Sequence, residues 1–313
     1  MILKQVIEVY DILDKADANG EEVKTYLQGY GEVDVTVKEL SSSKGSTDLV
    51  KLTIPGKNGK SKGGDAPTLG ILGRLGGIGA RPEVIGFVSD GDGALVAIAV
   101  AAKLLDMQRK GDILDGDVVI STHICPDAPT KEHYPTPFMD SPIDMMTMNE
   151  NEVDSSCDAI LSIDTTKGNR VINTRGFAIS PTVKEGYILK TSDNLLDIMQ
   201  TVTGKSPFVF PLSIQDITPY GNNLYHLNSI LQPAVATDAP IVGVAIAITT
   251  EMPVAGCATG ATNFSDLDSA GRFAIEVAKL FGRNKCDFYD KEEWEMLIKR
   301  YGKLNRFQTF GIQ

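Results

Sequence analysis

One stretch limits the fold of this chain more than any other. Residues 86–105 begin as an acidic, glycine-rich segment and continue into a helix that is apolar on nearly every side. A helix of that kind is buried all round, so we expect it at the centre of a large domain. Asp90 and Asp92 lie just before its first turn, where a carboxylate can cap free N–H groups and meets the positive end of the helix dipole.

Short apolar runs of strand type recur along the rest of the chain and alternate with segments of helical periodicity. The strand-like runs lie at 68–72, 117–122, 159–163 and 241–249, and the helical segments at 2–14, 21–27, 93–110, 193–203 and 267–281. This alternation predicts an α/β fold, a three-layer α/β/α sandwich around a mixed, mainly parallel central sheet. We expect a single domain over residues 1–313 that includes a charged helix over 287–306.

Composition and charge disfavour some classes of partner and of location. Lys and Arg number 30 against 41 Asp and Glu, a net charge of −11, which disfavours nucleic acid and anionic membrane as main partners. Lys4 and Glu8 interrupt the apolar N-terminus, which is unlike a signal peptide, and the longest apolar run, 240–248, is too short to span a bilayer. The four Cys show no C-x-x-C spacing, which fits reduced thiols in the cytoplasm.

Polar residues gather where the expected strands end. In an open α/β sheet the ligand site lies at the carboxyl ends of the strands, and the residues found there are Asp90, Asp92, His123, Cys125, Asp127 and Asp164. Carboxylates and an imidazole can hold zinc or another divalent metal that activates water. The alternative is structural: Asp90 caps the helix, Asp164 ends a strand in a turn, and His123 is a polar residue with internal hydrogen bonds.

Three further segments carry weaker signals. The loop over 73–79 follows a strand but lacks the G-x-G-x-x-G order, so we expect Arg74, with Gly76 and Gly77, to bind a substrate carboxylate instead. Cys125 lies close to His123 and could be a nucleophile, although an inert buried thiol is more common. Gly204-Lys205-Ser206 ends a helix rather than starting one, so it is not a P-loop.

Taken in order, these elements resemble the co-catalytic zinc exopeptidases, the aminopeptidases and related deacylases with a phosphorylase/hydrolase-like fold. The resemblance extends over residues 1–282. Ser89-Asp90-Gly91-Asp92-Gly93-Ala94 is similar to the bridging-aspartate motif at the head of the family's central helix, and 159–164 is similar to the strand that ends in the second ligand aspartate. The resemblance implies that Asp90 and Asp164 are metal ligands, with Asp92 competing for the first position.

The chain also departs from that family. Residues 74–77 stand where the family has a His-x-Asp motif, and His123, Cys125 and Asp127 stand where it has a Glu-Glu pair. No His follows Thr249, where the nearest candidates are Glu251, Cys257 and Thr259. A standard di-zinc site therefore cannot form. Asp90 follows the 73–79 loop so closely that the family's inserted lid or dimerisation domain is missing, and we expect a bacterial branch with a degenerate metal site.

These observations lead to two functional hypotheses. The first is a metallopeptidase-like hydrolase that cleaves an amide bond of a small peptide or an acylated amino acid. Its rebuilt metal site would bind zinc in preference to other divalent metals, through Asp90, Asp92, His123 and Asp164. The catalytic group would be His123, Asp127 or Cys125. The substrate would be bound by Arg74, Gly76 and Gly77. The second is a catalytically inactive relative that binds a small molecule or serves as an oligomeric subunit. We expect a homo-oligomer.

Overall fold

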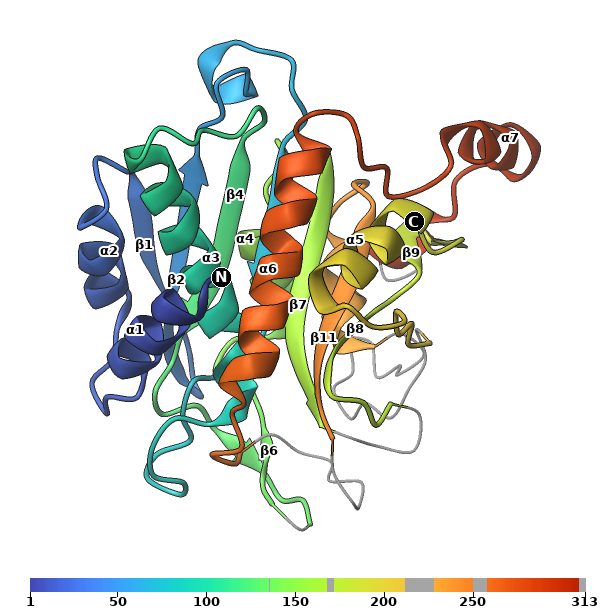
Figure 1. Ribbon diagram of the computed structural model, residues 1–313. Coiled ribbons are helices and arrows are strands. Elements are labelled where there is room, and N and C mark those ends of the chain that lie inside the picture. Colours follow the sequence, from blue (N-terminus) through green and yellow to red (C-terminus); the bar gives the residue numbers. More distant parts are fainter. Residues whose placement is uncertain (135, 168–171, 212–227, 250–257, 310–313) are drawn as a thin grey trace.

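The protein is built on a nine-stranded sheet, seen in a computed structural model that describes residues 1–134, 136–167, 172–211, 228–249 and 258–309 (Figure 1). The strand order is β1-β2-β4-β3-β7-β11-β9-β10, and β8 pairs with β11. The strands are β1 (Val35–Ser42), β2 (Gly45–Ile54), β3 (Leu69–Gly73), β4 (Val118–Ile124), β7 (Ala159–Lys167), β8 (Gly176–Ile179), β9 (Thr182–Lys184), β10 (Tyr187–Leu189) and β11 (Ile241–Ile248). A separate ribbon pairs β5 (Thr130–Lys131) with β6 (Phe138–Met139).

The four central strands, β4, β3, β7 and β11, are parallel, and the outer strands are antiparallel. Central parallel strands are covered on both faces, which explains why they are nearly continuous apolar runs. Successive side chains alternate between two cores: Ile71 and Leu161 belong to one, Leu72 and Ile160 to the other. The predicted mixed sheet with a parallel centre is confirmed.

Helices cover both faces of this sheet (Figure 1). On one face lie α1 (Leu3–Leu13), α2 (Gly20–Gln28), α3 (Asp92–Arg109), α5 (Asp193–Thr203) and α6 (Phe264–Phe281). The other face carries α4 (Met145–Glu152) and the 3-10 helix η3 (Ser229–Val235). Shorter 3-10 turns are η1 (Lys60–Lys62), η2 (Ser89–Gly91) and η4 (Asn305–Thr309). The three-layer arrangement is the one that the sequence predicted.

The helix α3 is buried on all sides, as its sequence indicates. Its inner side packs on β3, β4 and β7, while α1 and α6 cover its outer side. The close approach of α1 to α6 depends on a glycine, because a Cβ on Gly271 would lie 2.9 Å from Ile2 Cδ1. The Ile2 N–H also donates to Asp268 Oδ1 at 2.9 Å. The N-terminal helix thus closes the core over α3.

The C-terminal helix α7 (Lys291–Tyr301) lies apart from this core (Figure 1). Asp290 caps it by accepting the Glu293 N–H at 3.0 Å, and no residue of the helix is buried. Its main anchor is Trp294, over whose ring the Lys184 amine lies 4.8 Å from the centroid, a cation–π contact. Among the described helices, none has the length and apolar character needed to cross a bilayer.

Candidate functional site

The carboxyl ends of β3 and β7 form the switch point of the sheet. From β3 the chain passes through α3 to β4 on one side. From β7 it reaches β11, on the other side, after β8, β9, β10 and α5. Adjacent strands whose connections diverge in this way leave a crevice in which α/β proteins bind ligands. The start of α3 fits against both strand ends, because a Cβ on Gly93 would lie 2.4 Å from Arg74 O and 2.6 Å from Ile163 O.

Three of the predicted site residues fall in one row across the sheet. β3 pairs in parallel with β4 and β7, with Leu72 opposite both Ser121 and Ser162. Continuing this register places Arg74 between His123 and Asp164. A Cβ on Gly73 would point toward α3. Because side chains alternate along a strand, those of Arg74, His123 and Asp164 point to the opposite face of the sheet. Neighbouring strands lie about 4.8 Å apart, which puts the backbones of His123 and Asp164 roughly 10 Å apart, with a cationic side chain between them.

Both ring nitrogens of His123 have hydrogen-bond partners. Nε2 lies 2.9 Å from the Leu75 carbonyl oxygen and Nδ1 2.8 Å from Thr47 Oγ1. A carbonyl only accepts, so in the neutral ring Nε2 carries the proton and Nδ1 is the acceptor. Burial lowers the pKa of His123 to about 4, and the charge of Arg74 acts in the same direction. The geometry favours the structural role of His123 over the predicted role as ligand or base.

Arg74 is used inside the protein. Its buried guanidinium forms an ion pair with Glu152 of α4, and its other terminal nitrogen lies 2.8 Å from Met145 Sδ. Burial raises the pKa of Glu152, and the charge and hydrogen bond of Arg74 act against that rise. Sequence reasoning missed Glu152. The available signal was Arg74 itself, because an arginine at the end of a buried strand needs a carboxylate partner.

Asp90 holds the glycine loop in place. Its Oδ2 accepts the Gly76 N–H at 2.6 Å and the Gly77 N–H at 3.0 Å. Asp90 therefore joins the segment before α3 to the loop that follows β3. The amides of Gly76 and Gly77, predicted to bind substrate, are donors to a carboxylate of the protein.

Asp92 joins the start of α3 to the segment before α6. It is the first residue of α3, is fully buried, and its Oδ1 accepts the Thr262 hydroxyl at 2.8 Å. Next to it, the Ser89 N–H donates to the Thr259 carbonyl at 2.7 Å. Thr259, one of the candidates for the missing His position, therefore lies beside η2. Glu251 and Cys257 lie outside the described residues.

Asp164 lies at a partly open position of this edge. Its Oδ1 accepts the Thr165 N–H at 2.7 Å, and Asp164, Thr165 and Thr166 are all partly exposed. The Thr165 hydroxyl oxygen is nevertheless buried and has no hydrogen-bond partner within the part of the chain that the structure describes. A buried polar atom of this kind calls for an explanation, such as a bound ligand or water.

Cys125 and His123 do not form a catalytic pair in this structure. Cys125 Sγ lies 3.4 Å from the Ser46 carbonyl oxygen and 3.6 Å from Asp127 Oδ1, whereas His123 contacts Thr47 and Leu75. Burial raises the pKa of the Cys125 thiol to about 12, so the thiolate that a nucleophile requires is scarce at neutral pH. Asp127 is exposed and accepts from this thiol.

The described residues do not fit a metal centre. Among them, no group of three or more His, Cys, Asp or Glu side chains is arranged to hold a metal ion. The local reasons are the occupied nitrogens of His123, the cation between His123 and Asp164, and the hydrogen bonds that Asp90 and Asp92 make to other loops.

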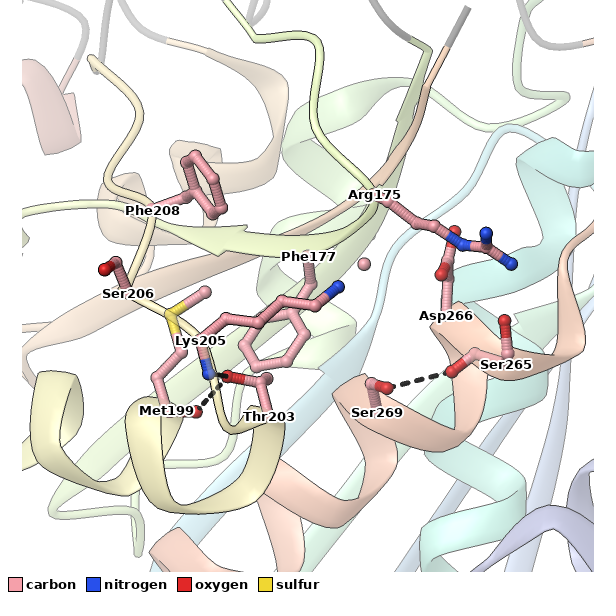
Figure 2. Close-up of a pocket in the computed structure, with 11 residues that line it drawn as sticks. Arg175, Phe177, Met199, Thr203, Lys205, Ser206, Phe208, Ser265, Asp266 and Ser269 are labelled. Atoms are coloured by element: carbon pink, nitrogen blue, oxygen red, sulfur yellow. Dashed lines mark hydrogen bonds between the residues drawn. The ribbon is translucent and has the colours of Figure 1, made fainter.

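A cavity of about 200 Å³ lies beside this edge, between α5, β8 and the start of α6 (Figure 2). Its walls carry the charged side chains Arg175, Lys205 and Asp266 and the apolar side chains Phe177 and Met199. Sequence reasoning did not assign this cavity. The sequence singled out only the helix end at Gly204-Lys205-Ser206, and nothing in it indicated that this segment meets Asp266.

The fold is similar to that of glutaminyl cyclases. An Acidobacteriales bacterium glutaminyl cyclase matches with a TM-score of 0.50 and 15% sequence identity, over 90% of this chain and 94% of that one. A glutaminyl cyclase of Macrostomum lignano matches with a TM-score of 0.46 and 11% identity, over 91% and 90% of the two chains. The first similarity confirms the predicted fold class, with flanking helices around a mainly parallel sheet in the zinc-exopeptidase-like arrangement.

Sequence comparison places the chain in a family. A search of curated proteins finds no match. A family model, described as "Protein of unknown function (DUF1177)", matches residues 38–311, which include every strand of the described sheet except the first residues of β1. The chain, with its switch-point carboxylates and its Arg74–Glu152 ion pair, belongs to this family.

Proposed function

We propose that the protein binds a small peptide or an acylated amino acid at the carboxyl edge of its sheet, beside Asp164 and Thr165. The observation that carries this proposal is the Thr165 hydroxyl, which is buried at the switch point without a partner in the described chain. The neighbouring Asp164 side chain points to the other face of the same strand and is partly exposed. Its carboxylate can accept from a ligand ammonium or amide N–H at the strand end, and a charge-assisted hydrogen bond of this kind is among the stronger ones.

Cleavage of the bound amide, as in a metallopeptidase-like hydrolase, is a second candidate. It is favoured by Asp90 and Asp164, which keep a carboxylate at two positions of the resemblance, Asp90 two residues before α3 and Asp164 in the second half of β7. A metal at this edge would need ligands beyond the described residues, which by themselves do not fit one. Binding without cleavage is therefore the function that the described geometry supports best.

Calorimetric titration with glycyl-leucine and N-acetyl-leucine tests the binding proposal. We expect at least one probe to bind the wild-type protein, and Asp164→Asn and Thr165→Val to weaken that binding. The loss of one hydrogen bond to a charged group is worth about 1.5–3 kcal/mol, or roughly 10- to 100-fold in Kd. Asp112→Asn is the matched control, because Asp112 is an exposed aspartate beyond the opposite end of α3. Absence of binding by both probes, or equal affinity in all four proteins, would contradict the proposal.

Release of free leucine from the same probes separates the two candidates. Turnover that requires near-stoichiometric zinc or manganese, and that is lost in Asp90→Ala and Asp164→Ala proteins that still fold, would establish the hydrolase. Binding that is sensitive to Asp164→Asn without leucine release would establish the binding protein.

A further inference from the structure

The cavity between α5, β8 and α6 is shaped by the ends of three elements. The helix α5 stops at Gly204, whose left-handed conformation (φ 68°) turns the chain so that Lys205 reaches the cavity. On the other side α6 starts at Asn263, whose side chain accepts the N–H groups of Ser265 and Asp266 at 3.1 and 3.4 Å. Arg175 immediately precedes β8. These three ends place two cations and one carboxylate around a common space (Figure 2).

Asp266 is the buried charge of this cavity. Only 3% of the residue is exposed, and the Gly176 N–H donates to its carboxylate. Burial raises the pKa of Asp266, while that hydrogen bond and the charges of Arg175 and Lys205 lower it. Within the described chain neither cation comes close enough to Asp266 to form an ion pair. A carboxylate that is buried with so few donors favours a cationic partner.

Arg175 and Lys205 supply the opposite charge. Both residues are exposed, and Figure 2 shows the Lys205 amine directed across the cavity toward the side where Asp266 lies. With one carboxylate and two cations, the cavity can hold a ligand that carries both an ammonium and a carboxylate. Phe177, which is buried, and Met199 are apolar side chains that line the same cavity, on the side from which Lys205 extends (Figure 2).

We propose that this cavity binds a free α-amino acid with an apolar side chain. The ligand ammonium donates to Asp266, its carboxylate accepts from Lys205 and Arg175, and its side chain packs on Phe177 and Met199. The volume of about 200 Å³ is below the roughly 300–1,000 Å³ of pockets for drug-sized ligands, which fits a molecule of amino-acid size. This site is separate from the edge at Asp164, and the proposal does not depend on binding there.

Calorimetry with three matched probes tests the proposal on the full-length protein. L-leucine carries both charges, 4-methylpentanoate lacks the ammonium, and 3-methylbutylamine lacks the carboxylate. We expect leucine to bind at least about tenfold more tightly than either of the others, since each lacks a charge-assisted contact. Absence of leucine binding, or equal affinity for the three probes, would overturn the proposal.

Variants assign the contacts. Lys205→Gln and Arg175→Gln change exposed side chains and should each weaken leucine about tenfold while leaving 3-methylbutylamine unchanged. Asp266→Asn should weaken leucine and the amine but leave 4-methylpentanoate unchanged. Lys62→Gln, at an exposed lysine of η1, and Asp164→Asn, at the other site, should bind leucine as the wild-type protein does. Wild-type leucine affinity in the Lys205→Gln and Arg175→Gln proteins would refute the site.

Discussion

Arg74 is the residue around which the carboxyl edge of the sheet is arranged. It stands between His123 and Asp164 in the strand register, and its guanidinium is paired with Glu152 on the far face. A guanidinium is always charged, so its place in this row must be compensated by a carboxylate and not by a metal. The same residue separates two predicted metal ligands and ties α4 to the sheet.

The Arg74–Glu152 pair should show strong coupling in a double-mutant cycle. Arg74→Met or Glu152→Leu alone leaves one buried charge uncompensated, and each should lower the free energy of unfolding by about 3–5 kcal/mol. The double variant should lose less than the sum of the two, because it leaves no charge behind. Urea denaturation of the four proteins measures the coupling, and additive losses would show that the pair is not energetically linked.

The stability of the protein should fall between pH 6.5 and 4 because of His123. Its pKa is about 4 in the folded protein against ~6.5 in the unfolded chain. The unfolded state therefore binds the proton first as pH falls, and the stability present above pH 6.5 is lost progressively down to pH 4. The shift corresponds to ~3 kcal/mol.

The control for that prediction is His123→Gln, which cannot titrate. The free energy of unfolding of both proteins is measured in urea at pH 7.5 and pH 4.5. Carboxylates such as Glu152 contribute equally to the two proteins, so their contribution cancels in the difference between wild type and variant. The difference between the proteins should shrink as pH falls. A difference that stays constant would mean that His123 does not titrate in this range.

At the scale of elements, the start of α3 is held against β3 and β7 by close backbone contacts. Gly73 and Gly93 let the helix touch the backbone of β3, because a Cβ on Gly73 would lie 2.6 Å from Gly93 O. The Arg74 N–H donates to Ile163 O at 2.7 Å across the same junction. The switch point is thus closed by backbone contacts, and its polar side chains are arranged around them.

Gly93→Ala should destabilise the protein and disturb the strand-end site together. The new methyl group would overlap two backbone carbonyls, of Arg74 and Ile163, that cannot move independently, and the cost should lie at or above the upper end of the roughly 1–3 kcal/mol seen for overpacked cores. Gly260→Ala is the control, since its nearest heavy atom would be 4.0 Å away. Thermal unfolding of both variants measures the effect, and equal midpoints would contradict the close packing.

The elements could be predicted from the sequence, but their lateral order could not. Apolar runs such as 159–163 identify buried strands, and the segment 21–27 was identified as helical, as α2 confirms. The placement of β3 between β4 and β7 depends on crossovers through α3 and α4, which local periodicity does not encode. The strand order β4-β3-β7 places Arg74 between His123 and Asp164. The sequence therefore identified the residues at the strand ends but not the contacts that they make. The site roles assigned to them stay predictions.

Across the whole molecule, burial falls from α3 outward to α7. Fourteen residues of α3 are buried, whereas α7 has none, and Met296 and Tyr301 are 64% and 65% exposed. Local opening free energy follows buried contacts. Native-state hydrogen exchange should therefore show the slowest amides in α3, β3 and β7, and amides in α7 that exchange by local opening well below the global unfolding free energy.

If the amides of α7 were protected from hydrogen exchange as strongly as those of α3, the expected fall in local stability from α3 to α7 would be contradicted for the isolated chain. Such protection would also support the predicted homo-oligomer, because a second copy could cover the exposed side of α7. Sedimentation at two protein concentrations distinguishes the two explanations, since protection that arises from association must follow the oligomer population.

The contact between Trp294 and Lys184 has a practical consequence for spectroscopy. Trp294 is the only tryptophan of the chain, and its indole lies against Lys184, Tyr187 and Tyr289. Intrinsic indole emission therefore reports on the docking of α7 against β9 and β10, and it does not monitor the buried core around α3. A ligand at the carboxyl edge or in the α5–α6 cavity should leave this emission unchanged, which makes it an internal reference for the peripheral helix.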